Sequence, residues 1–191
     1  MSRFVCVMLA MVSLLGVCMS ANAAVLGFDD ITMEDWTEVP DGYGGLNWDQ
    51  VYTLRKDYHP GSGYEYGTVS DSYVAYNYNA NPAWVTSDAT FDFNGAYLTA
   101  AWSNQDLQVL GYLDGTLRYD VTVPVVTTAP TWYDFDFMGI DALNIISLGG
   151  SQFAMDNFTY NETAAVPAPG AILLGMLGTG LVGYLRRRRA L

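Results

Sequence analysis

The chain has 191 residues, of which 51% are hydrophobic and 14% aromatic, and its formal net charge is −12. All 20 acidic residues lie between Asp29 and Glu162, where only Arg55, Lys56 and Arg118 are basic, so three positive against twenty negative charges give this region −17. Such a charge excludes nucleic acid and an anionic membrane surface as partners, and it suits an exported protein, calcium or neutral polysaccharide.

The first 23 residues have the three parts of a secretory signal peptide. Arg3 supplies the positive charge, Phe4–Val17 the apolar run, and small residues precede a cleavage site between Ala23 and Ala24. Both cysteines of the chain fall in this segment, so the exported chain would have no disulfide, thiol nucleophile or cysteine metal site. A lipoprotein attached through Cys18 is the alternative, which the bulky residue before it disfavours. We therefore predict export through the Sec machinery and removal of residues 1–23.

Residues 24–160 show the period-two alternation of β-strands, whereas helical periodicity is hard to find. Apolar and polar residues alternate in Ala89–Phe93, Leu117–Val123 and Tyr133–Phe137. Each pattern places the apolar side chains on one face of a strand and the polar side chains on the other. The further strand candidates are Val25–Phe28, Leu46–Leu54, Tyr73–Asn77, Tyr97–Trp102, Leu107–Leu113, Leu143–Leu148 and Gln152–Tyr160.

Clusters of Gly, Pro, Asn and Asp separate these strands, and Asp114-Gly115 between two strand patterns predicts a tight hairpin. About ten short strands with turns at this spacing are typical of an antiparallel β-sandwich. We predict an all-β fold over residues 24–160, an antiparallel β-sandwich of the jelly-roll type, followed by a polar linker at residues 161–165.

Acidic residues mark both ends of this region, Asp29 and Asp30 near its start and Asp156 near its end. The first and last strands of a jelly roll commonly pair, which would bring these carboxylates close together. Carboxylates that meet away from basic residues repel one another unless a cation joins them, and calcium takes about six to eight oxygen ligands. One interpretation is therefore a structural calcium site at Asp29, Asp30 and Asp156, and the other is that all three carboxylates are simply solvated.

Aromatic residues are dense in and beside the turns, and Tyr64 and Trp84 are among them. Exposed rings can stack on the apolar face of a sugar while Asp and Asn side chains bind its hydroxyl groups. Trp132 alternates with Tyr133, so it points outward if Tyr133 faces the core, and it is the best candidate for such stacking. Aromatic rings also bury a large area in any β core, so core packing is the alternative for Tyr64, Trp84 and Trp132.

No catalytic set stands out in the sequence. His59 is the only histidine, and a Ser-His-Asp hydrolase would have to use it with Ser62 or Ser70, but the Gly-x-Ser-x-Gly elbow is missing. One histidine also excludes a zinc site built on histidines. A glycosidase needs only two carboxylates, and the acidic residues show no marked pair. We predict a non-catalytic protein, with an extracellular polysaccharide-degrading glycosidase as the alternative.

The chain ends in three segments with different physical properties. A Pro-x-Pro motif cannot continue a helix. The uncharged run Gly170–Leu185 would span about 24 Å as a helix, short of the roughly 30 Å of a bilayer core, so it is a minimal membrane anchor. Four arginines follow, which favour the cytoplasmic side and leave the rest of the chain outside. The motif is Val166, Pro167, Ala168 and Pro169, and the basic cluster is Arg186, Arg187, Arg188 and Arg189.

This order of motif, apolar helix and arginines, over residues 166–191, resembles the PEP-CTERM sorting signal. The sequence departs from that family at Ala168, where Glu is usual. The resemblance implies a Gram-negative-type bacterium, recognition of the motif by an exosortase, and association with the cell surface and exopolysaccharide. An ordinary single-pass anchor without processing is the alternative.

The central region has a resemblance of its own, which Phe28–Asp30, Gly42–Trp48, Ser62–Tyr64 and Met155–Phe158 carry together. These stretches are similar to a pattern in secreted β-sandwich domains of exported PEP-CTERM proteins, which look like carbohydrate-binding-module jelly rolls. The resemblance implies a fold and no defined ligand. The sequence as a whole thus predicts an exported, exosortase-sorted surface protein that is associated with extracellular polysaccharide.

Overall fold

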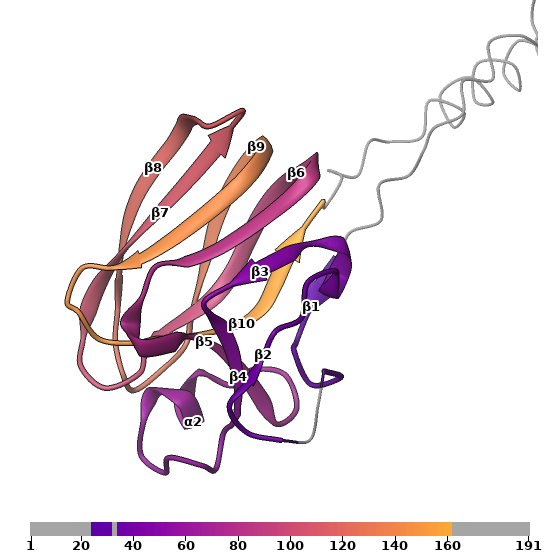
Figure 1. The fold of residues 1–191 in the computed structure, drawn as a ribbon. Coiled ribbons are helices and arrows are strands. Elements are labelled where there is room, and N and C mark those ends of the chain that lie inside the picture. Colours follow the sequence, from indigo (N-terminus) through magenta and orange to yellow (C-terminus); the bar gives the residue numbers. More distant parts are fainter. Residues whose placement is uncertain (1–23, 32–33, 162–191) are drawn as a thin grey trace, which may run out of the picture.

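The structure is a computed structural model, which describes residues 24–31 and 34–161. This part of the chain consists mainly of β-strands (Figure 1). The elements in chain order are β1 (Ala24–Leu26), β2 (Thr37–Glu38), the 3-10 helix η1 (Tyr43–Gly45), β3 (Asn47–Asp49), β4 (Val51–Arg55), α2 (Gly63–Gly67), β5 (Tyr73–Asn77), the 3-10 helix η2 (Tyr78–Ala80), β6 (Ala83–Ala100), β7 (Gln105–Leu113), β8 (Thr116–Val125), β9 (Thr131–Ser147) and β10 (Phe153–Tyr160).

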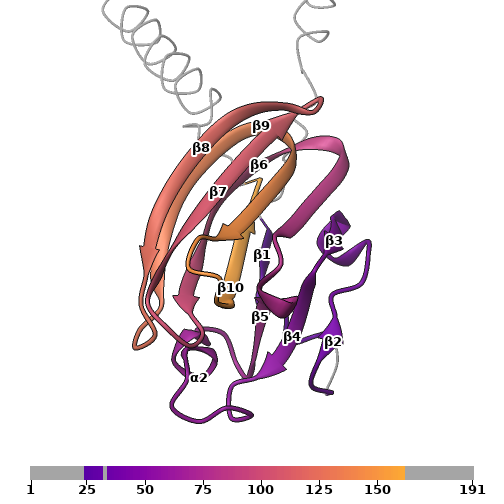
Figure 2. The same ribbon diagram turned by 60° about the vertical axis from the view of Figure 1, so that its left-hand side comes forward.

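The strands pair antiparallel in the order β2-β4-β5-β10-β6-β9-β7-β8, with β1 added on β10 and β3 on β6. Two strands are unusually long, β6 with 18 residues and β9 with 17. Their mutual pairing shifts register three times between Thr86 and Gly95. Such irregularities bend a strand, so each long strand takes part in both layers of a sandwich. Figure 2 shows the resulting strong curvature of β6, β7, β8 and β9.

One layer contains β3, the first part of β6, the last part of β9, β7 and β8, and the other contains β1, β2, β4, β5, β10, the last part of β6 and the first part of β9. The main core lies between them, where Val109 and Ile145 of the first layer share one buried cluster with Leu98 and Met155 of the second. The second layer has a smaller cluster as well, to which α2 contributes Tyr64. The second layer is therefore packed on both faces.

The predicted all-β sandwich is confirmed, and so are two local predictions. Asp114 and Gly115 have φ angles of 51° and 70° and form a two-residue turn between Leu113 and Thr116, as a primed hairpin turn requires. The first and last strands pair, with Ala24 opposite Tyr160.

The predicted strand boundaries were wrong in three places. Residues 89–93 and 97–102 largely fall within the single strand β6, and residues 133–137 and 143–148 largely within β9, because register shifts bend these strands without ending them. The predicted strand Leu46–Leu54 is instead two strands, β3 and β4, divided at Gln50, whose φ of 60° is left-handed.

The two targeting segments lie outside the described residues. These are the predicted signal peptide up to Ala23, the linker from residue 162 onward, and the predicted sorting signal at residues 166–191 with its apolar run and arginines. Among residues 24–31 and 34–161, no helix has the length and apolar character needed to cross a membrane.

Candidate functional site

The pairing of β3 with β6 creates an open groove on the surface of the sandwich. Asp49 lies opposite Trp84, and Asn47 lies opposite Thr86. Because side chains alternate along a strand, these four residues share one face, whereas Trp48 between them turns inward and is only 4% exposed. This groove, here called the Trp84 groove, has a volume of about 570 Å³. The residues that line it are Glu38, Asp41, Asn47, Trp48, Asp49, Trp84 and Thr86.

The Trp84 groove combines an aromatic surface with hydrogen-bonding groups. Trp84 is half-buried, and its ring lies 5.8 Å from that of Tyr112 at a tilt of 36°. The floor is fixed, since Trp48 donates its indole N–H to the Tyr43 carbonyl and its backbone N–H to Asp41. Around it, exposed carboxylate and amide side chains provide acceptors and donors. An aromatic face beside such groups is the arrangement that can bind a sugar ring and its hydroxyl groups.

The pairing of first and last strands brings Asp29 and Asp156 to the same loop, residues 69–73. Asp156, which is 0% exposed, accepts hydrogen bonds from the backbone N–H groups of Val69 (2.6 Å) and Ser70 (2.8 Å) and from the Ser70 hydroxyl. Asp29 accepts the next three N–H groups, those of residues 71, 72 and 73. Two carboxylates thus bind five consecutive backbone N–H groups, an arrangement called here the loop clamp.

The environments of the two clamp carboxylates shift their pKa values in opposite directions. Burial raises the pKa of Asp156, and the hydrogen bonds from Ser70, Val69 and Asn157 offset only part of that effect. Burial also acts to raise the pKa of Asp29, but hydrogen bonds from Ser70 and residues 71–73 outweigh it and hold the pKa below its usual value.

The expected calcium ligands therefore contact protein donors. Asp30, the third of them, is exposed and accepts a hydrogen bond of 2.7 Å from the Tyr43 hydroxyl. Within residues 24–31 and 34–161 there is no group of three or more His, Cys, Asp or Glu side chains placed to hold a metal ion. The sequence signal for the loop clamp was the pair of acidic ends, but the donors in the 69–73 loop could not be inferred from it.

The three predicted stacking residues lie in different surroundings. Trp84 lines the groove described above. Tyr64 is only 1% exposed, and its hydroxyl donates to Gln152 at 2.8 Å, so its ring offers no free face to a ligand. Trp132 is half-buried over Gly95, with its ring 5.3 Å from Tyr97, and lies outside the groove.

A second group of exposed rings lies near α2. Trp36, Tyr58 and Trp102 are 42%, 44% and 53% exposed. The His59 ring lies 5.9 Å from Trp36, 4.9 Å from Tyr58 and 5.0 Å from Trp102. These four residues, here called the aromatic platform, come from three separate loops. No spacing rule connects such positions, and only the fold brings them together.

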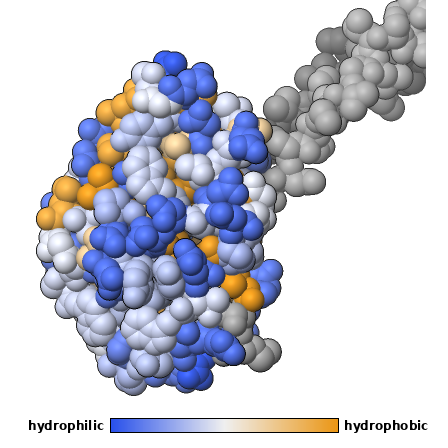
Figure 3. All heavy atoms as spheres, in the orientation of Figure 1, coloured by the Kyte–Doolittle hydropathy of each residue, from blue (hydrophilic) through white to orange (hydrophobic). Residues whose placement is uncertain are grey.

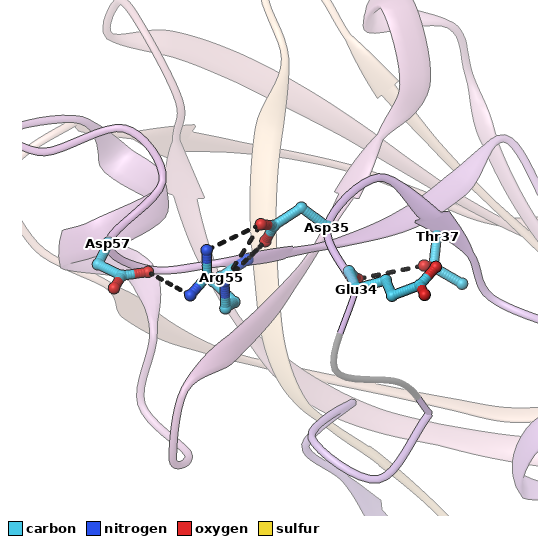
Figure 4. A network of polar contacts seen from close by, with 5 residues as sticks. All are labelled: Glu34, Asp35, Thr37, Arg55 and Asp57. Atoms are coloured by element: carbon cyan, nitrogen blue, oxygen red, sulfur yellow. Dashed lines mark hydrogen bonds and ion pairs between the residues drawn. The ribbon is translucent and has the colours of Figure 1, made fainter.

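An ion-pair network holds two of these loops in place (Figure 4). Arg55 at the end of β4 donates to Asp35 through both its backbone N–H and its side chain, at 2.9 and 3.1 Å, and its guanidinium lies 3.9 Å from Asp57. Asp35 precedes Trp36 and Asp57 precedes Tyr58. One arginine therefore positions both rings, which meet edge to face at 5.3 Å.

The candidate hydrolase residues do not assemble into a catalytic set. Ser62 donates its hydroxyl to the backbone carbonyl of His59 rather than to the imidazole, at 2.6 Å, and it also caps α2. The Ser70 hydroxyl has two acceptors within reach of its one hydrogen, Asp156 at 2.9 Å and the Gly27 carbonyl at 3.0 Å. Both serines thus hold loops.

The fold is similar to that of a solved DUF4465 family protein from Bacteroides caccae, with 12% identity, a TM-score of 0.56, and coverage of 73% of this chain and 98% of that one. Weaker likenesses are to the CBM22-1-CBM22-2 tandem domain from Paenibacillus barcinonensis Xyn10C (14% identity, TM-score 0.45, 81% of this chain and 49% of that one) and to a family 29 carbohydrate-binding module (12% identity, TM-score 0.42, 77% and 99%). No protein-family model and no curated protein matches this chain. The comparison with the first structure shows a shared fold.

Proposed function

We propose that this protein is exported, sorted to the cell surface by an exosortase that reads residues 166–169, and binds extracellular polysaccharide there through its jelly-roll domain without catalysis. The charge of −17 between Asp29 and Glu162 repels polyanions, whereas a neutral polysaccharide can approach without such repulsion.

The observation that carries the binding proposal is the Trp84 groove. It is open and lined by polar side chains, and it places one half-buried indole directly opposite Asp49. A polysaccharide chain needs such an open cleft because both of its ends must leave the site. The paired strands hold the indole in place before binding, which lowers the ordering cost of association.

Affinity electrophoresis of the purified full-length chain, in nonionic detergent with neutral polysaccharides in the gel, tests this site. We expect retardation by at least one neutral polymer and none by alginate, a polyanion. Replacing Trp84→Ala should weaken binding about tenfold, corresponding to roughly 1.4 kcal/mol, while Trp132→Ala should bind as the wild type does. A chain that no neutral polymer retards would contradict the proposal. A loss of affinity in Trp132→Ala but not in Trp84→Ala would place the binding site at Trp132 instead of in the groove.

Fractionation and mass spectrometry of the protein from its host test export and sorting. We expect a surface-associated or released form whose first residue is Ala24 and whose chain ends near Pro167. Replacing the four arginines at 186–189 by Gln should impair correct anchoring, because the positive charges favour the cytoplasmic side. Recovery of the intact 191-residue chain from the cytosol would refute this part of the proposal.

A glycosidase is the second candidate, because Glu38, Asp41 and Asp49 all line the same groove. Cleavage of a glycosidic bond requires a pair of carboxylic groups across the scissile bond. Release of reducing sugar by the wild type that is abolished in Glu38→Gln or Asp49→Asn would favour the enzyme. Binding without any such release favours the non-catalytic role.

A further inference from the structure

The aromatic platform is a second surface suited to a ligand, and none of its four residues lines the Trp84 groove. Its two tryptophans and Tyr58 each keep between 42% and 53% of their surface exposed. Single exposed aromatic residues are ordinary on protein surfaces, but here three converge on one imidazole. The group therefore forms a continuous aromatic surface.

The rings of the platform are fixed in place. Trp102 donates its indole N–H to Gln152, which also accepts the buried Tyr64 hydroxyl. Trp36 donates its backbone N–H to the carbonyl of Thr53 at 3.0 Å, and Arg55 tethers the residues preceding Trp36 and Tyr58. A surface that is ordered before binding loses less conformational entropy when a ligand arrives.

The backbone at Trp36 points to the same conclusion. Its φ angle is 63°, in the left-handed region that a bulky residue rarely adopts. Residues held in such a conformation cluster at ligand-binding sites, where the surrounding structure maintains them. Here the strained conformation holds an indole that is 42% exposed, so burial of this side chain does not account for the strain.

The charges beside the platform select the chemistry of the ligand. Asp57 keeps 71% of its side chain exposed next to Tyr58, while Arg55, the neighbouring cation, is already paired with Asp35 and Asp57. A polyanion would therefore be repelled, and an uncharged ligand with hydroxyl groups can use the carboxylate as an acceptor. On the face drawn in Figure 3, hydrophilic residues predominate, and many of the most hydrophobic ones lie along one edge.

The platform also connects with the Trp84 groove through a series of ring contacts. Trp36 meets Tyr76 at 5.9 Å, Tyr76 meets Tyr52 at 6.2 Å, and Tyr52 stacks on Tyr78 at 4.5 Å. Tyr52 lies opposite Glu38 in the β2–β4 pair, and Glu38 lines the groove. Aromatic side chains thus follow the β2–β4–β5 side of the molecule from one surface to the other.

We propose that Trp36, Tyr58 and Trp102, arranged around His59, form a second contact site for a neutral polysaccharide chain, separate from the Trp84 groove. The rings supply stacking faces for sugar residues, and Arg55 is a positioning residue that holds two of them. This inference rests on the proposed polysaccharide-binding function for the class of its ligand. None of the residues that line the groove belongs to this second site.

The test is affinity electrophoresis of the full-length chain with galactomannan and hydroxyethylcellulose, two neutral polymers, and with alginate as the polyanion. The double variant Trp36→Ala/Trp102→Ala should bind a neutral polymer about tenfold more weakly, and Trp36→Phe/Trp102→Phe should retain most of the affinity. Tyr66→Ala is the matched control, because Tyr66 is 45% exposed but takes part in no ring contact found within residues 34–161. The thermal midpoint of each variant, compared with the wild type, shows that folding is unchanged.

The outcomes separate this inference from the proposed function. Wild-type affinity in Trp36→Ala/Trp102→Ala, together with a loss in Trp84→Ala, would overturn the platform and leave the groove as the binding site. A loss in both, with Tyr66→Ala unaffected, supports two contact sites. Failure of the wild type to bind either neutral polymer would overturn both proposals, and binding to alginate alone would overturn the charge argument for both.

Discussion

The Trp84 groove and the aromatic platform both present aromatic rings to solvent, but they are built in different ways. Groove residues lie on the paired strands β3 and β6, so the ladder of backbone hydrogen bonds fixes their direction. Platform residues lie on loops, and only contacts distant in sequence hold them, such as Arg55 with Asp35 and Trp102 with Gln152. The groove should therefore keep its shape as long as the sheet exists, whereas the platform depends on individual side chains.

The loop clamp supports the platform, and not the groove, from the interior of the protein. Asp156 and Asp29 hold the 69–73 loop, which connects α2 with β5. α2 contributes Tyr64, whose ring contacts His59 and Trp102 of the platform, at 5.8 and 5.4 Å. The platform therefore lies on a helix and a loop whose position two carboxylates determine. Changes to this support should affect the platform before the groove.

The largest effect is expected from Asp156→Ala. It would leave the backbone N–H groups of Val69 and Ser70 without the buried carboxylate that accepts their hydrogen bonds, and we expect a loss of about 4 kcal/mol in the free energy of unfolding. Urea unfolding measures it, with the exposed Asp88→Ala as the control that should change little. A loss equal to that of the control would contradict the role given to the loop clamp.

Gly63→Ala should have the next largest effect, and it should act on the platform side alone. A Cβ atom at residue 63 would lie 1.7 Å from the backbone carbonyl oxygen of Ala100, so α2 would have to move away from β6. We expect a cost of about 3 kcal/mol, in the range of overpacking. When Gly63→Ala is added to Trp36→Ala/Trp102→Ala, in which only the groove can bind, the affinity for a neutral polymer should not change at temperatures where the protein remains folded. A loss of that affinity would show that the groove and the platform are coupled.

Much of the strand content could be predicted from the sequence, whereas the tertiary support of the loops could not. Alternation in Leu117–Val123 and the Asp114-Gly115 turn are local signals, and both are present in the structure. The bends in β6 and β9 arise from register shifts between strands distant in sequence, and a single strand carries no mark of its partner's register.

The same distinction holds for the candidate site. Trp84 could be selected from its sequence surroundings, and strand alternation explains its direction in the groove. Nothing in the sequence shows that Trp36 and Trp102 approach His59 from other loops. Likewise, the acidic ends predicted that Asp29 and Asp156 come together, but not that the same loop supplies the donors for both.

The pH dependence of stability should separate the two carboxylates of the loop clamp. The folded pKa of Asp156 is raised, so its contribution favours the folded state at pH values below its unfolded pKa and is lost as the pH rises through the folded pKa. The pKa of Asp29 is lowered, so its contribution is present above its unfolded pKa and is lost as the pH falls through the folded pKa.

Urea unfolding of the wild type, Asp156→Asn and Asp29→Asn as a function of pH measures these contributions. On acidification from neutral pH, the wild type should gain stability relative to Asp156→Asn, and at more acidic pH it should lose stability relative to Asp29→Asn. If the Asp156 difference had the opposite sign, the hydrogen bonds to this carboxylate would outweigh its burial.

The smallest effect is expected from Arg55→Gln, which tests how far the platform depends on its tether. The guanidinium is 45% exposed, and exposed ion pairs contribute little to stability, so the midpoint of unfolding should hardly move. Gln cannot bridge Asp35 and Asp57 as a cation, so Trp36 and Tyr58 should be less ordered and neutral polysaccharide should bind roughly threefold more weakly. Arg118→Gln, at an exposed position in β8, is the matched control for the loss of one positive charge. An equal loss of affinity in both variants would indicate a general effect of charge, whereas a loss in Arg55→Gln alone would show that the platform requires the order that its loops receive from Arg55.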